Sequence, residues 1–270
     1  MAARLVDAQA PGVARMLREM ASIPNSGEGW QARLLARLAK LHLLLEGYKN
    51  LAQLPLGIQS DVRTLVGWTQ NQEELLTQAG SQDRWLVLGQ LIEDDPLAGN
   101  NIRVQRIWLL GETTKRHVLI LSFAFGSQPF DTSLVPGSQL EAEIVFFPSA
   151  YPLRGLVKQR QTPSSTTKLA GYADIKAAIG GYAEALAQQP WLNRFPLLID
   201  QVWLLSTKDS WIIKDSLGHY LPVAASFSQG WPTLALSGGH PLTIFGEWDG
   251  VIFLPISMWT SDQFYLITGV

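Results

Sequence analysis

The chain has 270 residues, a formal net charge of −2 and no cysteine; 47% of its residues are hydrophobic and ten are tryptophan. This composition excludes a disordered chain, because disordered chains avoid burial through high net charge and few aromatic residues. The lack of cysteine excludes disulfides, thiolate catalysis and cysteine-based zinc or iron–sulfur sites within this sequence.

The first 80 residues are predicted to be helical. Between Trp30 and Asn50, apolar side chains recur at a spacing of three and four, which places them on one stripe of a helix: Leu34, Leu38, Leu41, Leu45 and Tyr48. Shorter helices are predicted over residues 58–68 and 70–78. Two more are predicted before residue 30, with Pro11 in the first turn of the second.

Residues 81–160 are predicted to form an antiparallel β block. Short runs rich in β-branched and aromatic residues alternate there with turn-forming residues, and these runs span residues 83–93, 101–112, 116–125 and 139–148. Because the connections are short, neighbouring strands are expected to pair antiparallel.

Residues 161–196 are predicted to be a linker followed by a helix. The linker is the Ser- and Thr-rich stretch 161–168, and the helix spans about residues 172–188, with Gly180-Gly181 as a weak or close-packed point. A second β block covers residues 197–270, with six predicted strands at residues 197–206, 210–215, 219–224, 233–239, 241–250 and 251–259. The fold class is therefore α+β, with a helical region over residues 1–80 followed by two mainly antiparallel β blocks. The two blocks suggest an internal duplication, although no fixed-period repeat establishes it.

Residues with catalytic or metal-binding chemistry are scattered. The four histidines are far apart in the sequence, and neither a metal-binding histidine pair nor a glycine-rich phosphate loop occurs. Glu141 and Glu143 would share one strand face about 7 Å apart, which suits either an acid–base pair or an ordinary solvated surface. We therefore predict no enzyme activity, no catalytic residue, no cofactor and no metal.

Six residues are the candidates for binding a partner. Arg84, Trp85, Arg106 and Trp108 belong to a middle block that is locally basic, and this block is the best patch for nucleic acid. Tyr151 and Arg154 follow a strand in a proline-bounded segment, and both residue types are favoured in binding hot spots. Alternation along the strands would instead scatter these charges over both faces, and Tyr151 would then pack on the sheet.

Several strings in the sequence resemble the C-terminal region of bacterial SWIM zinc-finger family proteins. They lie at residues 2–19, 68–76, 83–90, 103–112, 146–154 and 235–250, so the resemblance touches nearly the whole chain. In that family a Cys-x-Cys…Cys-x-His module precedes this region. It is absent here, so the chain is either a fragment that begins after the finger or a variant without it.

The resemblance implies a role beside other proteins. Family members are often encoded next to a MoxR-type ATPase and a von Willebrand A-domain protein, which makes these two the expected partners. The predicted function is thus a non-catalytic protein-interaction or scaffolding region that displays an exposed aromatic patch. The alternative is nucleic-acid binding through the basic, Trp-containing β block. A cytoplasmic location without membrane contact is expected, because no apolar run approaches the roughly 20 residues needed to cross a bilayer.

Overall fold

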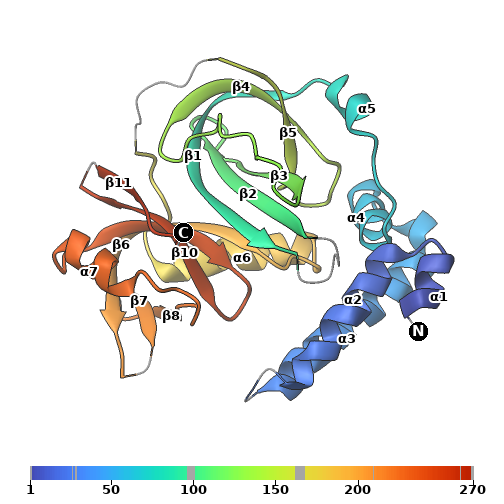
Figure 1. Cartoon of the computed structure of the whole chain (residues 1–270), viewed down its shortest axis with the longest axis horizontal. Coiled ribbons are helices and arrows are strands. Elements are labelled where there is room, and N and C mark those ends of the chain that lie inside the picture. The colour runs from blue at the N-terminus through green and yellow to red at the C-terminus, as the bar shows by residue number, and fades with distance from the viewer. Residues whose placement is uncertain are drawn as a thin grey trace.

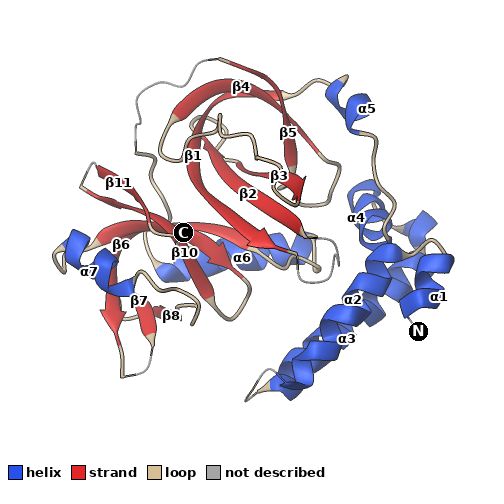
Figure 2. Ribbon diagram, in the orientation of Figure 1, coloured by secondary structure: helices blue, strands red, loops and turns tan. Residues whose placement is uncertain are grey.

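The computed structural model describes residues 2–25, 27, 29–95, 101–161, 168–208, 210–261 and 263–268. A group of helices lies to one side of two β sheets, and one long helix, α6 (Ile175–Gln188), lies between the first sheet and the second along the chain (Figures 1 and 2). The predicted α+β class is confirmed.

Four helices pack together at the amino-terminal end of the chain. They are α1 (Ala2–Asp7), α2 (Pro11–Ser22), α3 (Trp30–Lys49) and α4 (Leu56–Val66), with single 3₁₀ turns at Ile23–Asn25 and Leu51–Gln53. Their core consists of Val13, Leu44, Val62 and Val66, and it is completed by Trp191 from the other half of the chain. A short helix α5 (Gln72–Leu76) follows; it begins at Asn71, whose side chain accepts a hydrogen bond from the Glu73 amide.

The first sheet contains five antiparallel strands in the order β3-β2-β1-β4-β5. The strands are β1 (Ser81–Asp94), β2 (Ile102–Gly111), β3 (His117–Phe125), β4 (Gln139–Phe146) and β5 (Gly155–Arg160). The two edge strands meet: Leu119 forms a parallel bridge with Arg154, and the Leu119 amide donates to the Leu153 carbonyl at 2.7 Å. The sheet therefore curls into a partly closed barrel.

The second sheet repeats this connectivity. Its order is β11-β10-β9-β6-β7-β8, and its strands are β6 (Phe195–Ser206), β7 (Trp211–Asp215), β8 (Tyr220–Pro222), β9 (Leu242–Trp248), β10 (Phe253–Thr260) and β11 (Gln263–Leu266). A helix α7 (Gly230–Ser237) connects β8 to β9. The sheet closes through a parallel bridge between Val223 and Phe253.

The two barrels thus have the same topology. In each, three strands form a meander, the first strand also pairs with the fourth, and the fifth returns parallel to the third. This is the connectivity of the OB fold, a five-stranded Greek-key barrel. The suspected internal duplication is therefore present as a repeated topology, although no repeated sequence period marks it.

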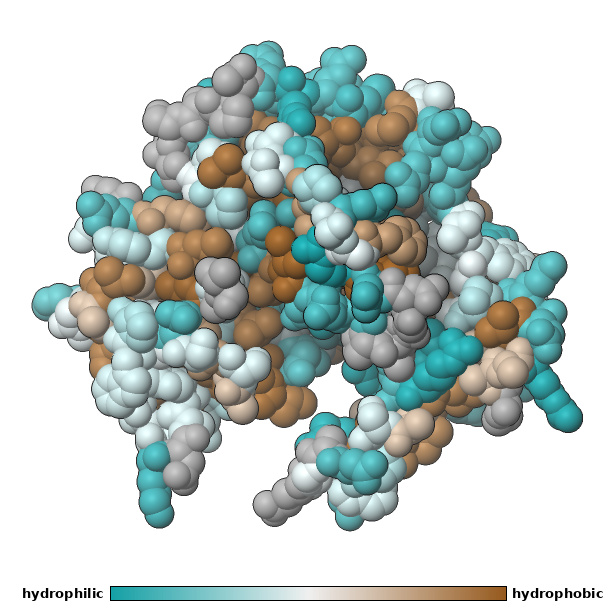
Figure 3. Space-filling model, in the orientation of Figure 1, coloured by the Kyte–Doolittle hydropathy of each residue, from teal (hydrophilic) through white to brown (hydrophobic). Residues whose placement is uncertain are grey.

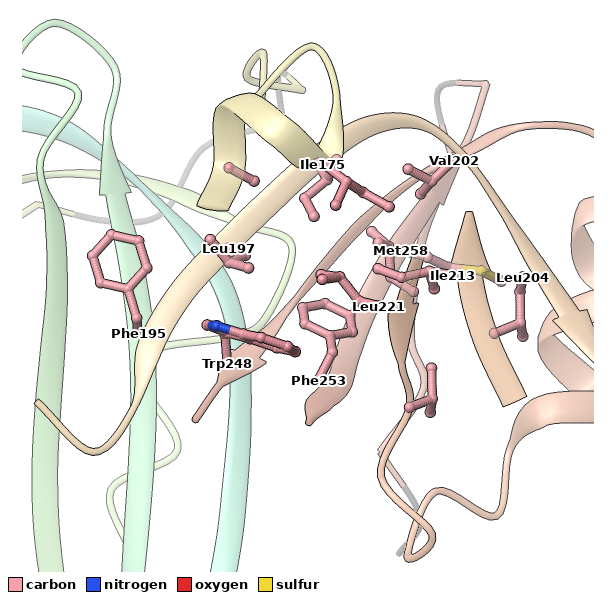
Figure 4. Packing of buried hydrophobic residues seen from close by; sticks show 14 of the residues in the cluster. Ile175, Phe195, Leu197, Val202, Leu204, Ile213, Leu221, Trp248, Phe253 and Met258 are labelled. Atoms are coloured by element: carbon pink, nitrogen blue, oxygen red, sulfur yellow. The ribbon is translucent and has the colours of Figure 1, made fainter. Parts of the chain in front are cut away.

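Each barrel has its own interior, and a third apolar cluster joins them. In β1, Trp85 and Val87 face the interior of the first barrel, whereas Leu86 and Leu88 face the second barrel. Both faces of this strand are buried, which explains why its sequence is a continuous apolar run and not an alternating one. The interior of the second barrel is larger; Figure 4 shows Phe253, Leu221 and Met258 among its packed side chains.

Gly89 permits the close contact between the two barrels. Strand β1 has a register shift between Val87 and Gly89, and a Cβ added at Gly89 would clash with Ile256 of β10. The hydroxyl of Ser257 donates to the Leu88 carbonyl at the same place. Gly89 therefore lets the backbones of the two barrels approach closely.

The helical bundle is fixed to both halves of the β region. Asp61 on α4 accepts a hydrogen bond from the Ala150 amide in the β4–β5 loop and a second from Gln189 at the end of α6. Lys40 on α3 donates to the Leu192 carbonyl, and the Trp191 indole donates to the Lys40 carbonyl. The bundle thus contacts both barrels through side chains.

Most predicted elements are found, and four differ. Residues 233–239 were expected to form a strand but belong mainly to helix α7, because Pro232 favours a helical first turn and Gly238 ends the helix in the left-handed conformation. Strands β5 and β11 were not predicted, and α5 is shorter than expected.

The linker prediction falls mainly on residues 162–167, which lie outside the described residues. The four predicted domain limits stay a prediction.

The apolar side chains of α3 lie along one stripe of the helix, as predicted, but this stripe does not form the core of the bundle. Only Leu44 on this helix is fully buried, whereas Leu38, Leu45 and Tyr48 are exposed. Leucine occupies several sides of this helix, so spacing alone does not choose the side that packs.

Candidate functional site

A buried ion pair joins the two barrels. Arg106 on β2 and Glu247 on β9 lie 2.9 Å apart between Nε and Oε1, and both are almost fully buried. Arg106 also donates to Glu93, and the Trp108 indole donates to Glu247 at 2.8 Å. Burial lowers the pKa of Arg106, but hydrogen bonds and charges from Glu93 and Glu247 outweigh it and raise this pKa above its usual value. The cluster is fully paired, which suits a structural role.

The six residues predicted to bind a partner do not form one surface. Trp85 lies inside the first barrel, where its indole donates to the Ala142 carbonyl. Arg106 and Trp108 lie in the contact between barrels. These three side chains are buried and are not available to a partner in this state, so the predicted basic, Trp-containing patch is not assembled on the surface. The physical reason is that both faces of β1 and β2 are covered.

The other three candidates lie near the surface at separate places. Arg84 on β1 is 3.4 Å from Glu112. Arg154 stacks on the ring of Phe147 at 4.3 Å, and burial lowers its pKa. Tyr151 lies in the β4–β5 loop with its ring 6.0 Å from that of Phe195. A binding role for these three stays a prediction.

Tyr151 lines a cleft of about 460 Å³ at the junction of the two barrels. The walls come from the β2–β3 turn (residues 115–117), the β4–β5 loop (151–153) and the segment before α6 (170–172), together with Leu110, Gln188 and Leu198. We call this space the junction cleft. Its size falls within the range of small-molecule sites, about 300–1,000 Å³.

The rim of the junction cleft is cationic. Lys115 and Arg116 occupy the turn between β2 and β3, and the guanidinium of Arg116 lies 3.6 Å from the centre of the Phe146 ring. Burial lowers the pKa of Arg116, against a smaller opposite influence of Tyr151. Burial also raises the pKa of Tyr151, as does the charge of Glu184, so its phenol stays protonated at neutral pH.

His117 carries the buried polar atom of the cleft. Burial lowers its pKa to about 4, so the ring is neutral at physiological pH. Its Nε2 is buried and has no hydrogen-bond partner in the part of the chain that the structure describes. An unpaired buried polar group costs about 1–3 kcal/mol, so such groups require an explanation.

A second feature is an exposed apolar surface on α3. Leu35 is 68% exposed, Leu38 46% and Leu45 45%. At the end of the same helix Tyr48 meets Trp68 edge to face, with ring centroids 6.3 Å apart, and both are exposed. We call these five residues the α3 apolar surface; hydrophobic side chains are visible along the bundle in Figure 3.

A third feature is the outer face of the strands β6, β7 and β8. The register places Trp203, Lys214 and Tyr220 in one row across the three strands. Lys214 and Tyr220 are exposed. In the OB fold, the face of the second and third strands is where oligonucleotides and oligosaccharides bind, and here those strands are β7 and β8.

Acidic and histidine side chains do not gather into a metal site. Within the described ranges, no three of the metal-binding residue types are close enough to hold an ion. Glu141 and Glu143 share a face of β4, as the sequence indicated, but Glu143 is engaged by Lys158 at 3.0 Å and by the Gly80 amide. His219 lies 3.1 Å from Asp215, and neither lines the junction cleft.

Sequence reasoning missed the junction cleft. It selected Tyr151, but no motif pointed to Tyr172 or Gln188. These two residues lie after the predicted linker, in another segment of the chain. Trp203, Lys214 and Tyr220 were also missed. Knowing that the β7–β8 hairpin repeats the β2–β3 hairpin could have pointed to them, but only the strand pairing reveals that repeat.

The comparisons with known proteins concern mainly the helices. The family model described as the SWIM-associated four-helix bundle domain matches residues 1–66. No curated protein matches the chain. A solved structure titled "Crystal structure of the tetrameric p202 HIN2" is 12% identical, and the match covers 70% of this chain and 95% of that one with a TM-score of 0.27.

The matched segment coincides with the observed helices. Residues 1–66 contain α1, α2, α3 and α4, which share one apolar core. None of the helices in the described ranges has the length and apolar character that a membrane span requires. The resemblance to SWIM-family proteins is therefore confirmed over residues 1–66, which match the model of the SWIM-associated four-helix bundle domain.

Proposed function

We propose that this chain is a non-catalytic, cytoplasmic protein-interaction region of a SWIM-type protein, and that the α3 apolar surface binds a helix of the partner. The observation that supports this proposal is the row of exposed apolar side chains at Leu35, Leu38, Leu45 and Tyr48. Their spacing follows one side of a helix, which is the pattern of anchors that a partner helix engages. Exposed apolar patches of this kind mark interaction sites.

The charge of the bundle suggests the character of the partner helix. Residues 1–66 contain eight Lys or Arg residues and five Asp or Glu residues, whereas the whole chain has a net charge of −2. An amphipathic helix with acidic residues beside its apolar face therefore complements this domain. The family resemblance makes the MoxR-type ATPase and the von Willebrand A-domain protein the proteins to test.

The test uses the whole chain with each of these two proteins in purified form. We expect a complex in size-exclusion chromatography and a dissociation constant measurable by calorimetry. The double variant Leu38→Glu/Leu45→Glu should weaken binding at least 100-fold, because burying each leucine contributes about 1.5–3 kcal/mol.

The matched control is Leu43→Glu. Leu43 is 43% exposed, close to the value for Leu45, but it lies on another side of α3. This variant should bind as the unmodified chain does. Binding of neither protein, or equal binding by the double variant, would show that the α3 apolar surface is not the docking site.

Nucleic-acid binding is the second candidate, and the row Trp203, Lys214 and Tyr220 favours it. The exposed ring of Tyr220 on the third strand lies beside Lys214 on the second, and the half-buried ring of Trp203 on the first strand continues the row. This arrangement suits stacking of single-stranded bases. This fold-level analogy moves the expected surface from the first β block to the second.

Fluorescence anisotropy with a single-stranded oligonucleotide should show affinity that falls steeply with salt. Tyr220→Ala should abolish the signal and Lys176→Ala on α6 should keep it; salt-insensitive binding would eliminate this candidate.

A further inference from the structure

The junction cleft combines apolar walls with cations at one end. Leu110, Leu153 and Leu198 form apolar parts of its wall, and Tyr151 and Tyr172 contribute phenol rings. Lys115 and Arg116 lie together at the β2–β3 turn, and no carboxylate is among the described residues that line the cleft. A space of this composition accommodates a flat organic molecule that carries a negative charge at one end.

Arg116, one of the two cations of the cleft, is held in place. Arg116 stacks on Phe146, which fixes its guanidinium plane and reduces the entropy lost when it binds an anion. Among the described residues no carboxylate forms an ion pair with Arg116, in contrast to Arg84, Arg106 and Arg194 on other parts of the barrels. Arg116 is thus free to pair with an anion from outside.

His117 is an independent observation that points to the same place. It lines the cleft, its side chain is partly exposed, and its Nε2 is buried without a protein partner within the described residues. A neutral imidazole offers this nitrogen as a donor or an acceptor, depending on its tautomer. A bound molecule with a polar group on its ring would satisfy it.

The far wall depends on a glycine of α6. A Cβ added at Gly181 would overlap the hydroxyl of Tyr172, so only glycine lets Tyr172 lie against the helix. Because Tyr172 is part of the wall, Gly181 determines the shape of the cleft. Close packing at this wall therefore explains Gly181, whereas a Cβ added at Gly180 would meet nothing within 4 Å.

We propose that the junction cleft is a binding site for a small aromatic anion, with a phosphate or carboxylate held by Lys115 and Arg116 and a planar ring placed between Tyr151, Tyr172 and His117. This ligand site is separate from the α3 apolar surface and from the outer face of β7 and β8. A ligand bound there contacts both barrels at once and stabilises their arrangement.

The experiment uses histidine side-chain NMR of the full chain, because the sequence has four histidines and His117 is the one that lines the cleft. Four probes are added separately: adenosine 5′-monophosphate, 4-hydroxybenzoate, adenosine and inorganic phosphate. We expect a saturable shift of the His117 ring resonances with at least one of the two aromatic anions, while the resonances of His42, His219 and His240 stay in place.

The probes separate the two sources of negative charge. A response to the nucleotide alone identifies a phosphate ligand, and a response to 4-hydroxybenzoate identifies an aromatic carboxylate. If adenosine bound as tightly as the nucleotide, the charge of Lys115 and Arg116 would not contribute to binding. If inorganic phosphate shifted the His117 resonances as much as the nucleotide does, the aromatic ring of the ligand would not contribute to binding. Either result, or the absence of any shift at His117, overturns the proposal.

A pair of variants tests the role of Arg116. Arg116→Gln should weaken binding of the anionic probe at least tenfold, because a hydrogen bond between charged groups contributes about 1.5–3 kcal/mol. Arg18→Gln on α2 is the control with the same charge change on the bundle, and it should leave binding unchanged. Equal affinity of Arg116→Gln and the unmodified chain would contradict the proposal.

Discussion

In the first barrel, the outer face of the second strand carries Arg106, Trp108 and Leu110, and all three are buried against the second barrel. In the second barrel, the corresponding strands β7 and β8 carry Lys214 and Tyr220 on the outer face, and both are exposed. The interiors of the two barrels are built alike, from apolar side chains at alternate positions. The repeated fold therefore serves assembly in one copy and leaves the equivalent face open in the other.

The same contrast holds for the hairpins that join the second and third strands. In the first barrel this hairpin leads into His117, whose Nε2 is buried in the junction cleft without a hydrogen-bond partner among the described residues. In the second barrel it contains Asp215 and His219, which pair at 3.1 Å. Equivalent turns thus carry a histidine in opposite environments.

The largest expected effect comes from breaking the contact between the barrels. Glu247→Ala removes the buried carboxylate of the pair and leaves Arg106 with only the partly exposed Glu93, and the loss of one member of a buried ion pair costs about 3–5 kcal/mol of unfolding free energy. Urea denaturation should show this loss. The double variant Arg106→Met/Glu247→Leu is the control and should recover at least half of it. A cost below about 1 kcal/mol for Glu247→Ala would mean that the ion pair does not hold the barrels together.

Acid should weaken the first barrel through His117. Its pKa is about 4 in the folded chain, below the value of about 6.5 of an exposed histidine, so the unfolded chain takes up this proton first as the pH falls. Stability is therefore lost between about pH 6.5 and pH 4, and His117 accounts for roughly 3 kcal/mol of it. His117→Gln should flatten this part of the stability profile, with exposed His42→Gln as the control for loss of an imidazole. An unchanged profile in His117→Gln contradicts the assignment.

The hairpin of the second barrel should respond to loss of Asp215. Burial opposes the charge of Asp215, but hydrogen bonds from the Ile175 amide and from His219 outweigh it and hold the pKa of this carboxyl below its usual range. Its contribution is thus present above the unfolded pKa and is lost as the pH falls through the folded one. Asp215→Ala should lower the unfolding free energy by about 2 kcal/mol at pH 7. Thermal unfolding at pH 7 checks this value, and a variant as stable as the unmodified chain would refute it.

The smallest effect on stability is expected on the open face of the second barrel. Tyr220→Ala removes an exposed side chain and should change the unfolding free energy by less than about 0.5 kcal/mol. In the first barrel, Trp108→Ala at a covered position should cost about 3–5 kcal/mol. Similar costs for these two substitutions would show that the two outer faces do not differ as described.

The strands and most helices follow from local sequence patterns. Apolar runs separated by turn residues identified nine of the eleven strands in the described part of the chain, because turn chemistry is local. The two missed strands are short, and β5 is half polar. The stretch Thr233–Ser237 alternates like a strand, but its neighbours Pro232 and Gly238 favour a helix that begins and ends within one loop.

The candidate sites depend on contacts that no local pattern reveals. Trp85 and Trp108 were expected in a surface patch because the block around them is locally basic, but the second barrel and the interior of the first cover both faces of their strands. The junction cleft is formed by segments that lie up to 88 residues apart in the sequence, as Leu110 and Leu198 do. Only the closure of both barrels brings these segments together.

The contact between Trp191 and the helical bundle has a consequence for biosynthesis. The Trp191 indole donates to the carbonyl of Lys40, a residue 151 positions earlier in the chain. The four helices therefore leave the ribosome long before the side chain that seals their core, and their leucines are uncovered during that interval. A translation product that stops before α6 carries an unsealed bundle, which makes it a substrate for chaperones and proteases, whereas the finished chain closes the bundle with its own second half.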